Sequence, residues 1–434
     1  MTGPVARARG WALAREVRAL EALRAGFPDA RARRDFQLER LNAVWAEARA
    51  QVPYWRQLGP SLPPRFRTLE EFAATIPETT RDVVQKAGLD LAHAGRPPDQ
   101  WRMTGGSTSR PVRLPAWKSE FRETRGDTWL GRSWYGVRPE HRLFLLWGHA
   151  HVLGSGIQGR VRAAHRTVWD RLLGYHRFSA YDLRPEAMRR AGAALLRFAP
   201  DWTVAYSMAL HAFAAANADR REQFHRLRLR VAVATAEAFP DEGSAARVAD
   251  LLGCPVAMEY GSVETGVLAH TRPEGFFEVL WHRYLVEAVP ADRGARVLVT
   301  SLFPRCTPLF RYDMGDEVTL PPGASAMAVD RVQHVLGRCN EYVELPDGTR
   351  LHSEVFAHAV RPCPEILGFQ VMVGSGDPRL AVLLGAPLSE EARRGVLSRL
   401  GRVHAGLAGM EIVRVEALRQ TLAGKTRMIV RQES

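Results

Sequence analysis

Lysine is almost absent from this chain of 434 residues, and cysteine is scarce. Lysine and arginine together number 60, yet only Lys86, Lys118 and Lys425 are lysines. The four cysteines include no C-x-x-C pair, which argues against both a zinc site and a disulfide framework. We therefore expect isolated buried thiols, and chemistry that needs an ammonium group has only three candidate side chains.

Long hydrophobic runs are missing as well. No stretch approaches the roughly 18 apolar residues that a membrane-spanning helix requires, and charged residues interrupt every apolar stretch through Arg49. That pattern excludes a secretory signal, and acids such as Glu16 and Glu21 argue against an organellar transit peptide. We expect a soluble, cytoplasmic protein with no membrane partner.

The composition is that of a globular protein with a basic surface. Hydrophobic residues make up 46% and charged residues 25% of the chain, unlike disordered, collagenous or coiled-coil sequences. The formal net charge of +13 indicates a surface that attracts anions. No basic stretch is interleaved with aromatic residues in a recognisable module, and the arginines are dispersed among acids, so we expect no nucleic-acid partner.

The pattern of apolar residues predicts an α/β fold class. Residues 1–53 are expected to form a helical docking segment with a break at Gly26-Phe27-Pro28. Amphipathic helices then alternate with short apolar strands, which is typical of mostly parallel sheets covered by helices. Residues 276–320 become rich in strands, and from Glu341 onward the pattern resets to a small α+β unit.

Individual elements can be predicted from the periodicity. In the α/β region, helices are expected at 119–134, 185–198, 207–219 and 243–252, and strands at 142–147, 202–206, 228–235 and 255–260. In the C-terminal unit, we expect a hairpin over 341–351, helices at 353–361 and 389–404, and strands at 366–373, 379–384 and 411–417.

The segment that most strongly indicates chemistry is Thr104-Gly105-Gly106-Ser107-Thr108-Ser109-Arg110-Pro111. Glycines let backbone N–H groups approach an anion, hydroxyls donate hydrogen bonds, and successive amides can form a nest for phosphate oxygens. A surface loop of small polar residues is the plainer alternative. The segment also approaches the G-x-S-x-G elbow of hydrolases, but the prolines at 111 and 115 disfavour the helix that this motif requires.

Another glycine-rich segment, Gly154-Ser155-Gly156-Ile157-Gln158-Gly159, matches the dinucleotide pattern G-x-G-x-x-G. Its first glycine lies several residues past the predicted strand, instead of in the tight turn that the motif requires. A bend between strand and helix explains it better. His149 and His151, just before it, have no third ligand nearby, so we favour structural histidines over a metal site.

Three further segments follow in a fixed order. Met258-Glu259-Tyr260-Gly261-Ser262-Val263-Glu264 places an aromatic ring and a carboxylate on a turn after a predicted buried strand. Arg311-Tyr312-Asp313-Met314-Gly315-Asp316 presents two carboxylates beside an arginine, and Leu422-Ala423-Gly424-Lys425-Thr426-Arg427 carries a lysine on a glycine-containing tail. Taken singly, they could be a core aromatic, turn-forming aspartates and a solvated lysine.

Together these segments resemble the adenylate-forming superfamily of acyl-CoA synthetases, and within it the phenylacetate-CoA ligase branch. The similarity runs from Val52-Pro53-Tyr54-Trp55-Arg56-Gln57-Leu58-Gly59 to the glycine-lysine tail. It implies an ATP- and acid-binding N-terminal domain over 1–338 and a hinge after Gly337-Arg338. A small, mobile α+β C-terminal lid domain over 339–434 would carry the catalytic lysine.

The resemblance also implies roles for single residues. Tyr260, followed by Gly261, resembles the aromatic residue beside adenine, and Glu264 resembles the carboxylate that helps to hold Mg²⁺. Asp316 resembles the aspartate that binds the ribose hydroxyls, and Arg338 the arginine that follows it onto the nucleotide. The loop that holds the β- and γ-phosphates of ATP is matched by Thr104, Gly105, Gly106, Ser107 and Thr108.

Further positions match the nucleotide and acid pockets. Glu237 resembles the loop that lines the adenine pocket, and His151 resembles the histidine that borders the acyl pocket. Trp147 and His149 are expected beside it, by position. Two departures concern the phosphate loop and the hinge. Ser109 and Val112 stand where glycine and lysine are usual, and Asn340-Glu341 replaces an aspartate-rich hinge, which bears on the thioester step more than on adenylation.

Lys425 is similar to the lysine that bridges the acid's carboxylate and the α-phosphate. A carboxylate that attacks a phosphate must overcome repulsion between anions, and an ammonium together with Mg²⁺ neutralises the developing charge. Lysine suits this role because it is a compact charge on a flexible stem, whereas arginine presents a broad fork. Its rarity in this chain adds weight to Lys425.

The resemblance implies an AMP-forming acid ligase with ATP, Mg²⁺ and CoA as its cofactors. ATP and a carboxylic acid, expected to be aromatic, would give an acyl-adenylate and pyrophosphate, and the acyl group would pass to CoA. Alternative acceptors are an amine, a hydroxyl or the thiol of an acidic carrier protein in secondary metabolism. An inactive nucleotide-binding relative is the remaining alternative, against which the intact Glu264, Asp316 and Lys425 argue.

Overall fold

The N-terminal segment consists of two long helices, α1 (Pro4–Ala25) and α2 (Ala30–Gln51), as predicted. Asp29 caps α2 by accepting a hydrogen bond from the Ala32 N–H. Short helices follow at α3 (Pro53–Leu58), α4 (Leu69–Thr75) and α5 (Arg81–Ala87). The computed structural model describes residues 3–103, 113–147, 156–180, 183–338, 342–347, 349–360, 362–374, 376–420, 426 and 428–431.

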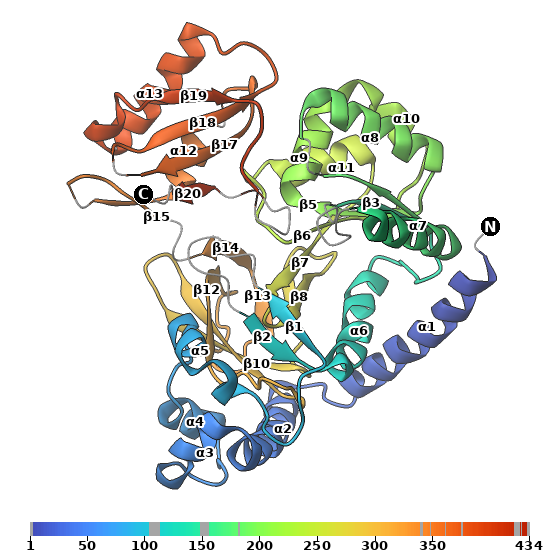
Figure 1. Ribbon diagram of the computed structural model, residues 1–434, viewed down its shortest axis with the longest axis vertical. Helices are drawn as coiled ribbons and strands as arrows, with labels where there is room; N and C mark the ends of the chain where they lie inside the picture. The colour runs from blue at the N-terminus through green and yellow to red at the C-terminus, as the bar shows by residue number, and fades with distance from the viewer. Residues whose placement is uncertain are drawn as a thin grey trace.

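A sheet of eight strands forms the centre of the molecule (Figure 1). Its order is β13-β9-β8-β7-β6-β5-β3-β4; the strands from β4 to β7 pair in parallel, and β8, β9 and β13 add antiparallel. The bounds are β3 (Leu143–Leu146), β4 (Tyr175–Phe178), β5 (Trp202–Tyr206), β6 (Ala232–Thr235), β7 (Val256–Ser262), β8 (Gly266–Thr271), β9 (Phe277–Val279) and β13 (Arg331–Val332).

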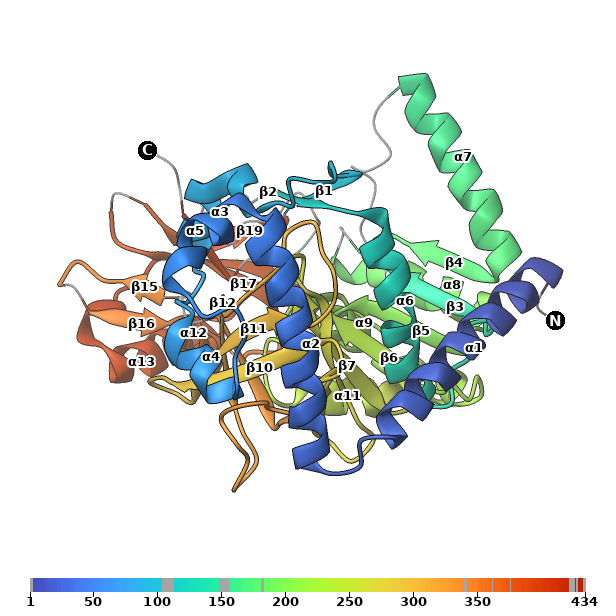
Figure 2. The same ribbon diagram turned by 90° about the horizontal axis from the view of Figure 1, so that it is seen from below.

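Helices bury both faces of the parallel part of this sheet, which explains its continuous apolar strands. Along β6, Val233 packs into one core, while Ala232 and Ala234 pack into another. The first core includes residues of α1 and α6, and the second includes residues of α8, α9 and α11. The bounds are α6 (Lys118–Ser133), α7 (Gly156–Leu173), α8 (Pro185–Phe198), α9 (Ser207–Ala216), α10 (Arg221–His225) and α11 (Ser244–Leu252). Figure 2 shows the N-terminal end of α7 projecting from the body, while its C-terminal end lies beside the start of α1.

The strand-rich region forms a second, antiparallel sheet in the order β10-β11-β12-β14. Its strands are β10 (Tyr284–Pro290), β11 (Ala295–Ser301), β12 (Tyr312–Thr319) and β14 (His334–Arg338). A separate pair, β1 (Gln100–Met103) and β2 (Arg113–Ala116), flanks the glycine-rich segment 104–112. The predicted change in the character of the sheets is therefore confirmed.

The C-terminal unit has its own core and lies beside α9 (Figure 1). A hairpin, β15 (Tyr342–Glu344) and β16 (Arg350–His352), precedes a sheet in the order β19-β18-β17-β20. Its remaining elements are α12 (Ser353–Val360), β17 (Ile366–Val373), β18 (Arg379–Leu384), α13 (Glu390–Val403), β19 (Ile412–Val415) and β20 (Ile429–Arg431). Leu383 and Leu418 belong to this unit, but their side chains pack into the core around α9.

The structure also decides between the alternatives for the glycine-rich segments. Strand β2 follows segment 104–112, so the helix that a hydrolase elbow requires is replaced by a strand. Strand β3 ends at Leu146 and Gly156 already lies in α7, so the glycine pattern does not follow directly on the strand as the dinucleotide motif requires; residues 148–155 lie outside the described residues. Neither motif therefore explains the chemistry of this chain.

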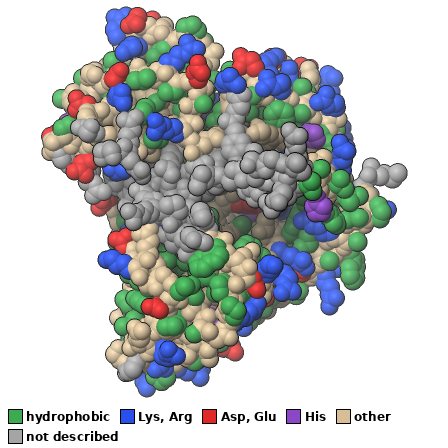
Figure 3. Space-filling view, viewed as in Figure 1, with side chains coloured by type: hydrophobic (Ala, Val, Ile, Leu, Met, Phe, Trp, Pro, Cys, Tyr) green, Lys and Arg blue, Asp and Glu red, His purple; other side chains and the backbone are tan. Residues whose placement is uncertain are grey.

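The scarce thiols are buried, as expected. Cys254, Cys306 and Cys363 are free thiols, and Cys339 lies outside the described residues. Burial raises the pKa of Cys254 to about 12 and that of Cys306 to about 11. Within the described ranges, no helix combines the length and hydropathy needed to cross a membrane. On the face in Figure 3, basic side chains are spread among acidic and apolar ones.

The docking of α2 generates a test of stability. Trp45 is fully buried, and its ring meets those of Trp55 and Phe310 edge to face, at centroid distances of 5.7 and 5.4 Å. We expect Trp45→Ala to lower the free energy of unfolding of the N-terminal body by about 3–5 kcal/mol, because it leaves a cavity. Denaturant unfolding measures the change. Trp11→Ala is the matched control, since Trp11 is 68% exposed; an equal loss there would contradict the docking role.

Candidate functional site

The predicted site residues divide into two groups. Those outside the described residues are Thr104, Gly105, Gly106, Ser107, Thr108, His149, His151 and Lys425. Those that the structure places are Trp147, Glu237, Tyr260, Gly261, Glu264 and Asp316, together with the backbone of Arg338. Of the second group, Tyr260, Gly261, Glu264, Asp316 and the backbone of Arg338 lie together at the end of β7 and on strands β12 and β14, Glu237 contacts the start of α9, and Trp147 lies just beyond β3.

A tight turn at the end of β7 carries the predicted carboxylate. The Ser262 N–H donates to Thr265 Oγ1 at 3.1 Å, and the Thr265 N–H donates to Ser262 Oγ at 3.2 Å. These reciprocal bonds close the turn around Glu264. At the start of this turn, the backbone of Gly261 lies very close to β8. A Cβ atom on Gly261 would lie 1.9 Å from the Gly266 carbonyl oxygen. Only glycine fits there without a backbone shift.

Strand β12 crosses this turn and contributes a bulge. Gly315 has a φ of 68°, and its N–H donates to Asp313 Oδ1 at 2.8 Å, where the register with β11 shifts. Beyond the bulge, Asp316 Oδ2 accepts a 3.0 Å hydrogen bond from the Tyr260 hydroxyl. The aromatic residue and the aspartate that the sequence placed 56 residues apart are therefore in direct contact.

The same strand holds Glu264. Before the bulge, the Tyr312 hydroxyl donates to Glu264 Oε1 at 2.9 Å. Glu264 and Tyr312 are 5% and 3% exposed, so the carboxylate is fixed by a buried partner rather than by solvent. Tyr312 is a site residue that the sequence reasoning missed. The position of Tyr312 within the motif Arg311–Asp316 indicated that it could belong to the site. The sequence alone did not indicate that its hydroxyl contacts Glu264.

Arg338 meets the site through its backbone. It lies opposite Asp316 in the β12–β14 ladder, so the predicted arginine and ribose-binding aspartate are cross-strand neighbours. Glu259, one residue before Tyr260, anchors β7 to α6 by an ion pair of 2.7 Å with Arg132. Burial alone would raise the pKa of Glu259, but Arg132 and His270 bring it to about 2.

Glu237 joins the large body to the C-terminal unit. Its Oε1 accepts from the Met208 N–H at the start of α9, at 3.2 Å, and its Oε2 accepts from the Thr426 N–H, also at 3.2 Å. Thr426 directly follows Lys425 and forms a β-bridge with Gln420. The predicted adenine-pocket residue thus contacts the residue next to the predicted catalytic lysine. Thr426 itself was missed by the sequence reasoning.

Trp147 lies just beyond β3 and faces Tyr206 at the end of β5. Their ring centroids are 4.2 Å apart, with the planes tilted by 37°. Because parallel strands end at the same edge of a sheet, this pair lies at the edge where α/β proteins bind ligands. The two histidines that the sequence grouped with Trp147 lie outside the described residues.

The carboxylates of the site are compatible with a magnesium ion bound to a nucleotide. Among the described residues, no cluster of three or more His, Cys, Asp or Glu side chains could hold a metal ion alone. Mg²⁺ bound to nucleotides needs only one or two protein carboxylates besides phosphate oxygens and water. Glu264 provides such a carboxylate, and its Oε1 is already oriented by Tyr312.

Comparisons with known proteins identify the fold. No family model and no curated protein matches the chain. Among solved structures, 2-hydroxyisobutyryl-CoA ligase in the postadenylation state with R3-HIB-AMP has a TM-score of 0.70 at 16% identity, covering 94% of this chain and 91% of that one. The anthranilate CoA ligase AuaEII with anthranoyl-AMP has a TM-score of 0.50 at 15% identity, covering 75% and 65%. The chain has the fold of these adenylate-forming ligases.

The likeness depends on the state of the relative. The same 2-hydroxyisobutyryl-CoA ligase with 2-HIB-AMP and CoA in the thioesterification state gives a TM-score of only 0.58, at 16% identity and 93% and 91% coverage. Since the two structures share one sequence, the difference in score reflects the arrangement of their parts. The present structure is therefore arranged more like the postadenylation form.

The close approach at Gly261 generates a prediction. We expect Gly261→Ala to lower the free energy of unfolding by about 1–3 kcal/mol, as overpacked sites do, because the backbone between β7 and β8 has to shift. Thermal unfolding measures the change. Gly376→Ala is the control, since a Cβ there meets nothing within 4 Å; an equal loss in that variant would contradict the close approach at Gly261.

Proposed function

We propose that this protein activates a carboxylic acid with ATP, forming an acyl-adenylate and pyrophosphate. The observation that carries the proposal is the convergence of Tyr260, Glu264 and Asp316 through two hydrogen bonds from different strands. The family resemblance assigns these three residues to adenine, Mg²⁺ and ribose. Their meeting at one place, in a chain with an adenylate-forming fold, supports one nucleotide site better than three unrelated structural roles.

In the proposed mechanism, the described residues bind and orient the nucleotide. Tyr260 would present its ring to adenine, while its hydroxyl donates to Asp316, whose carboxylate would accept from the ribose hydroxyls. Glu264 would hold the magnesium ion, which would neutralise charge on the phosphates. Segment 104–112 would bind the β- and γ-phosphates, with contacts from Arg110 or Arg113.

Lys425 would place its ammonium between the acid's carboxylate and the α-phosphate. The hydrogen bond from the Thr426 N–H to Glu237 supports this role, because it fastens the adjacent residue to the start of α9. We propose residues 339–434 as the mobile lid domain that carries this lysine, with the hinge after Arg338. The likeness to the postadenylation form of a CoA ligase agrees with a lid in the adenylation position.

The acid is proposed to be aromatic and the acceptor to be CoA. The Trp147 ring supports a planar substrate, because it is partly exposed at the ligand-binding edge of the sheet and packs on the buried Tyr206 ring. AuaEII, one of the similar structures, is an anthranilate CoA ligase. Acyl transfer to an amine, a hydroxyl or an acidic carrier protein in a biosynthetic pathway is the alternative, which the basic composition also suits.

The test of the proposed function is an ATP–pyrophosphate exchange screen over aromatic and aliphatic acids, repeated with CoA. Exchange with an aromatic acid, followed by thioester formation, is the expected result. Exchange without a thioester would favour the other acceptors. The absence of exchange with every acid would contradict the proposal and favour an inactive nucleotide-binding relative.

The catalytic lysine is tested by Lys425→Ala. We expect acid-dependent exchange to fall at least about a hundredfold, because charge developing on the α-phosphate loses its ammonium partner, while ATP binding by calorimetry stays close to wild type. Lys86→Ala is the matched control, since this lysine is exposed on helix α5. Wild-type exchange by Lys425→Ala would reject its role.

The ribose contact is tested by Asp316→Ala. Loss of a hydrogen bond to a charged group costs about 1.5–3 kcal/mol, so ATP affinity should fall roughly tenfold to a hundredfold by calorimetry. Tyr260→Phe serves as the comparison, because it removes the hydroxyl that contacts Asp316 but keeps the carboxylate and the ring. An equal loss in both variants would mean that Asp316 acts only through Tyr260.

A further inference from the structure

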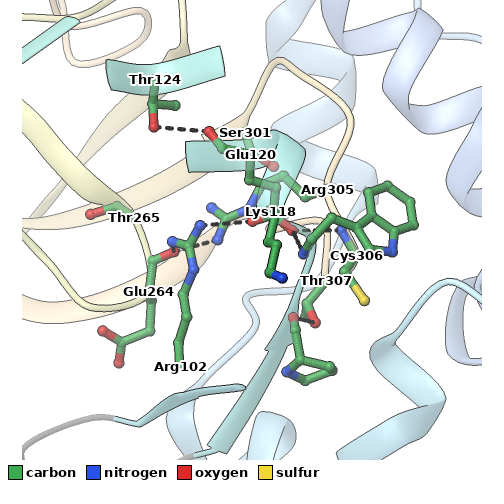
Figure 4. Close-up of polar contacts among 12 residues, drawn as sticks. Arg102, Lys118, Glu120, Thr124, Glu264, Thr265, Ser301, Arg305, Cys306 and Thr307 are labelled. Atoms are coloured by element: carbon green, nitrogen blue, oxygen red, sulfur yellow. Dashed lines mark hydrogen bonds and ion pairs between the residues drawn. The ribbon is translucent and has the colours of Figure 1, made fainter. Parts of the chain in front are cut away.

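A buried carboxylate, Glu120, joins the two ends of segment 104–112 to the rest of the site (Figure 4). Its Oε2 accepts a 2.8 Å hydrogen bond from Arg102, on the strand that leads into the segment. Its Oε1 accepts from the Trp117 N–H, directly after the strand that leaves it, at 2.8 Å, and from the Cys306 N–H at 3.0 Å. Glu120 is 1% exposed.

Two arginines beside Glu120 converge on the Glu264 turn. Arg102 Nη1 donates to the carbonyl oxygens of Val263 and Glu264, at 3.3 and 3.4 Å. Arg305 Nη2 donates to the same Glu264 carbonyl oxygen, and its Nε lies 3.4 Å from Glu120 Oε2. In Figure 4 both guanidinium groups point to the main chain of Glu264, while its carboxylate points away from them.

The energetics of burial favour a specific task for this pair. The Arg102 and Arg305 side chains are 9% and 2% exposed, and removing two like charges from water is costly unless each is well paired. Burial, and then repulsion by Arg305, lower the pKa of Arg102 to about 10. Apolar residues could fill the same volume at a lower cost of desolvation. What the two arginines provide in addition is a set of N–H donors to the carbonyl oxygen of Glu264.

We propose that Arg102 and Arg305, held by Glu120, are positioning residues that fix the Glu264 turn for metal-bound ATP. Glu264 is then held at two points: Tyr312 orients its carboxylate, and the two arginines hold its main chain. Arg102 also lies on β1, the strand that leads into segment 104–112, so the same cluster ties this strand to the Glu264 turn. The inference rests on the proposed function, since it takes Glu264 as the magnesium ligand.

The main test is Arg305→Met, compared with Arg305→Lys. We expect the methionine variant to need at least about tenfold more Mg²⁺ for half-maximal ATP–pyrophosphate exchange. AMP affinity by calorimetry should change less than about twofold, because AMP binding needs Tyr260 and Asp316 but no metal. Lysine keeps the charge without the fork and should restore part of the loss. Mn²⁺ binding with a non-hydrolysable ATP analogue, followed by electron paramagnetic resonance, should weaken in the same order.

Arg283→Met is the matched control. Arg283 is another largely buried arginine, paired with Asp127 on α6 at 2.9 Å, and its side chain is 13% exposed. The Arg283→Met variant should have a lower melting temperature and an unchanged Mg²⁺ requirement for exchange. A wild-type Mg²⁺ requirement and wild-type Mn²⁺ affinity in Arg305→Met would overturn the inference, as would an equal shift in Arg283→Met.

Two outcomes separate this inference from the proposed function. If the wild-type protein shows no exchange with any acid, the proposed function fails, and the Mn²⁺ measurement alone decides the positioning role. If Arg305→Met does not fold, Arg305→Lys is measured alone and in the Glu264→Gln background. Additive effects on Mn²⁺ affinity in that background would overturn the inference, because positioning residues have nothing to position once the ligand is removed.

Discussion

The crossing of strand β12 over the turn that ends β7 is the contact on which the whole site depends. Tyr312 and Asp316, on either side of the Gly315 bulge, each meet a residue of the β7 end, namely Glu264 and Tyr260. These strands belong to different sheets, so their side-chain hydrogen bonds join the two halves of the N-terminal body. Stability and the proposed chemistry therefore share the same few contacts.

Arginine and lysine have different tasks in this molecule. Arginines form many of the described buried and half-buried pairs, such as Arg102 with Glu120 and Arg132 with Glu259, where a planar fork can reach several acceptors at once. Lysine is reserved for few positions, and the proposed catalytic one lies next to the residue that Glu237 holds. The excess of arginine thus describes how the body is built more than what it binds.

Local patterns predicted the elements well. The helix expected at 185–198 and the strands at 202–206, 366–373 and 379–384 have those bounds in the structure, because buried faces impose their own period on the sequence. The strand at 228–235 was predicted too long, since β6 begins at Ala232. Leu229 and Val231, before that point, are buried but lie outside β6, although the Val231 carbonyl accepts from the Thr203 N–H on β5. Periodicity alone cannot distinguish a buried residue next to a strand from one within it.

The sequence by itself determined the α/β class, the order of the motifs and the rarity of lysine, because each can be read from neighbouring residues. Only the tertiary structure decided that Tyr312 holds Glu264, that Glu120 accepts from Cys306 and that Thr426 donates to Glu237. These partners lie 48, 186 and 189 residues apart. No local period links such residues, and their contact exists only once the two sheets and the C-terminal unit have packed together.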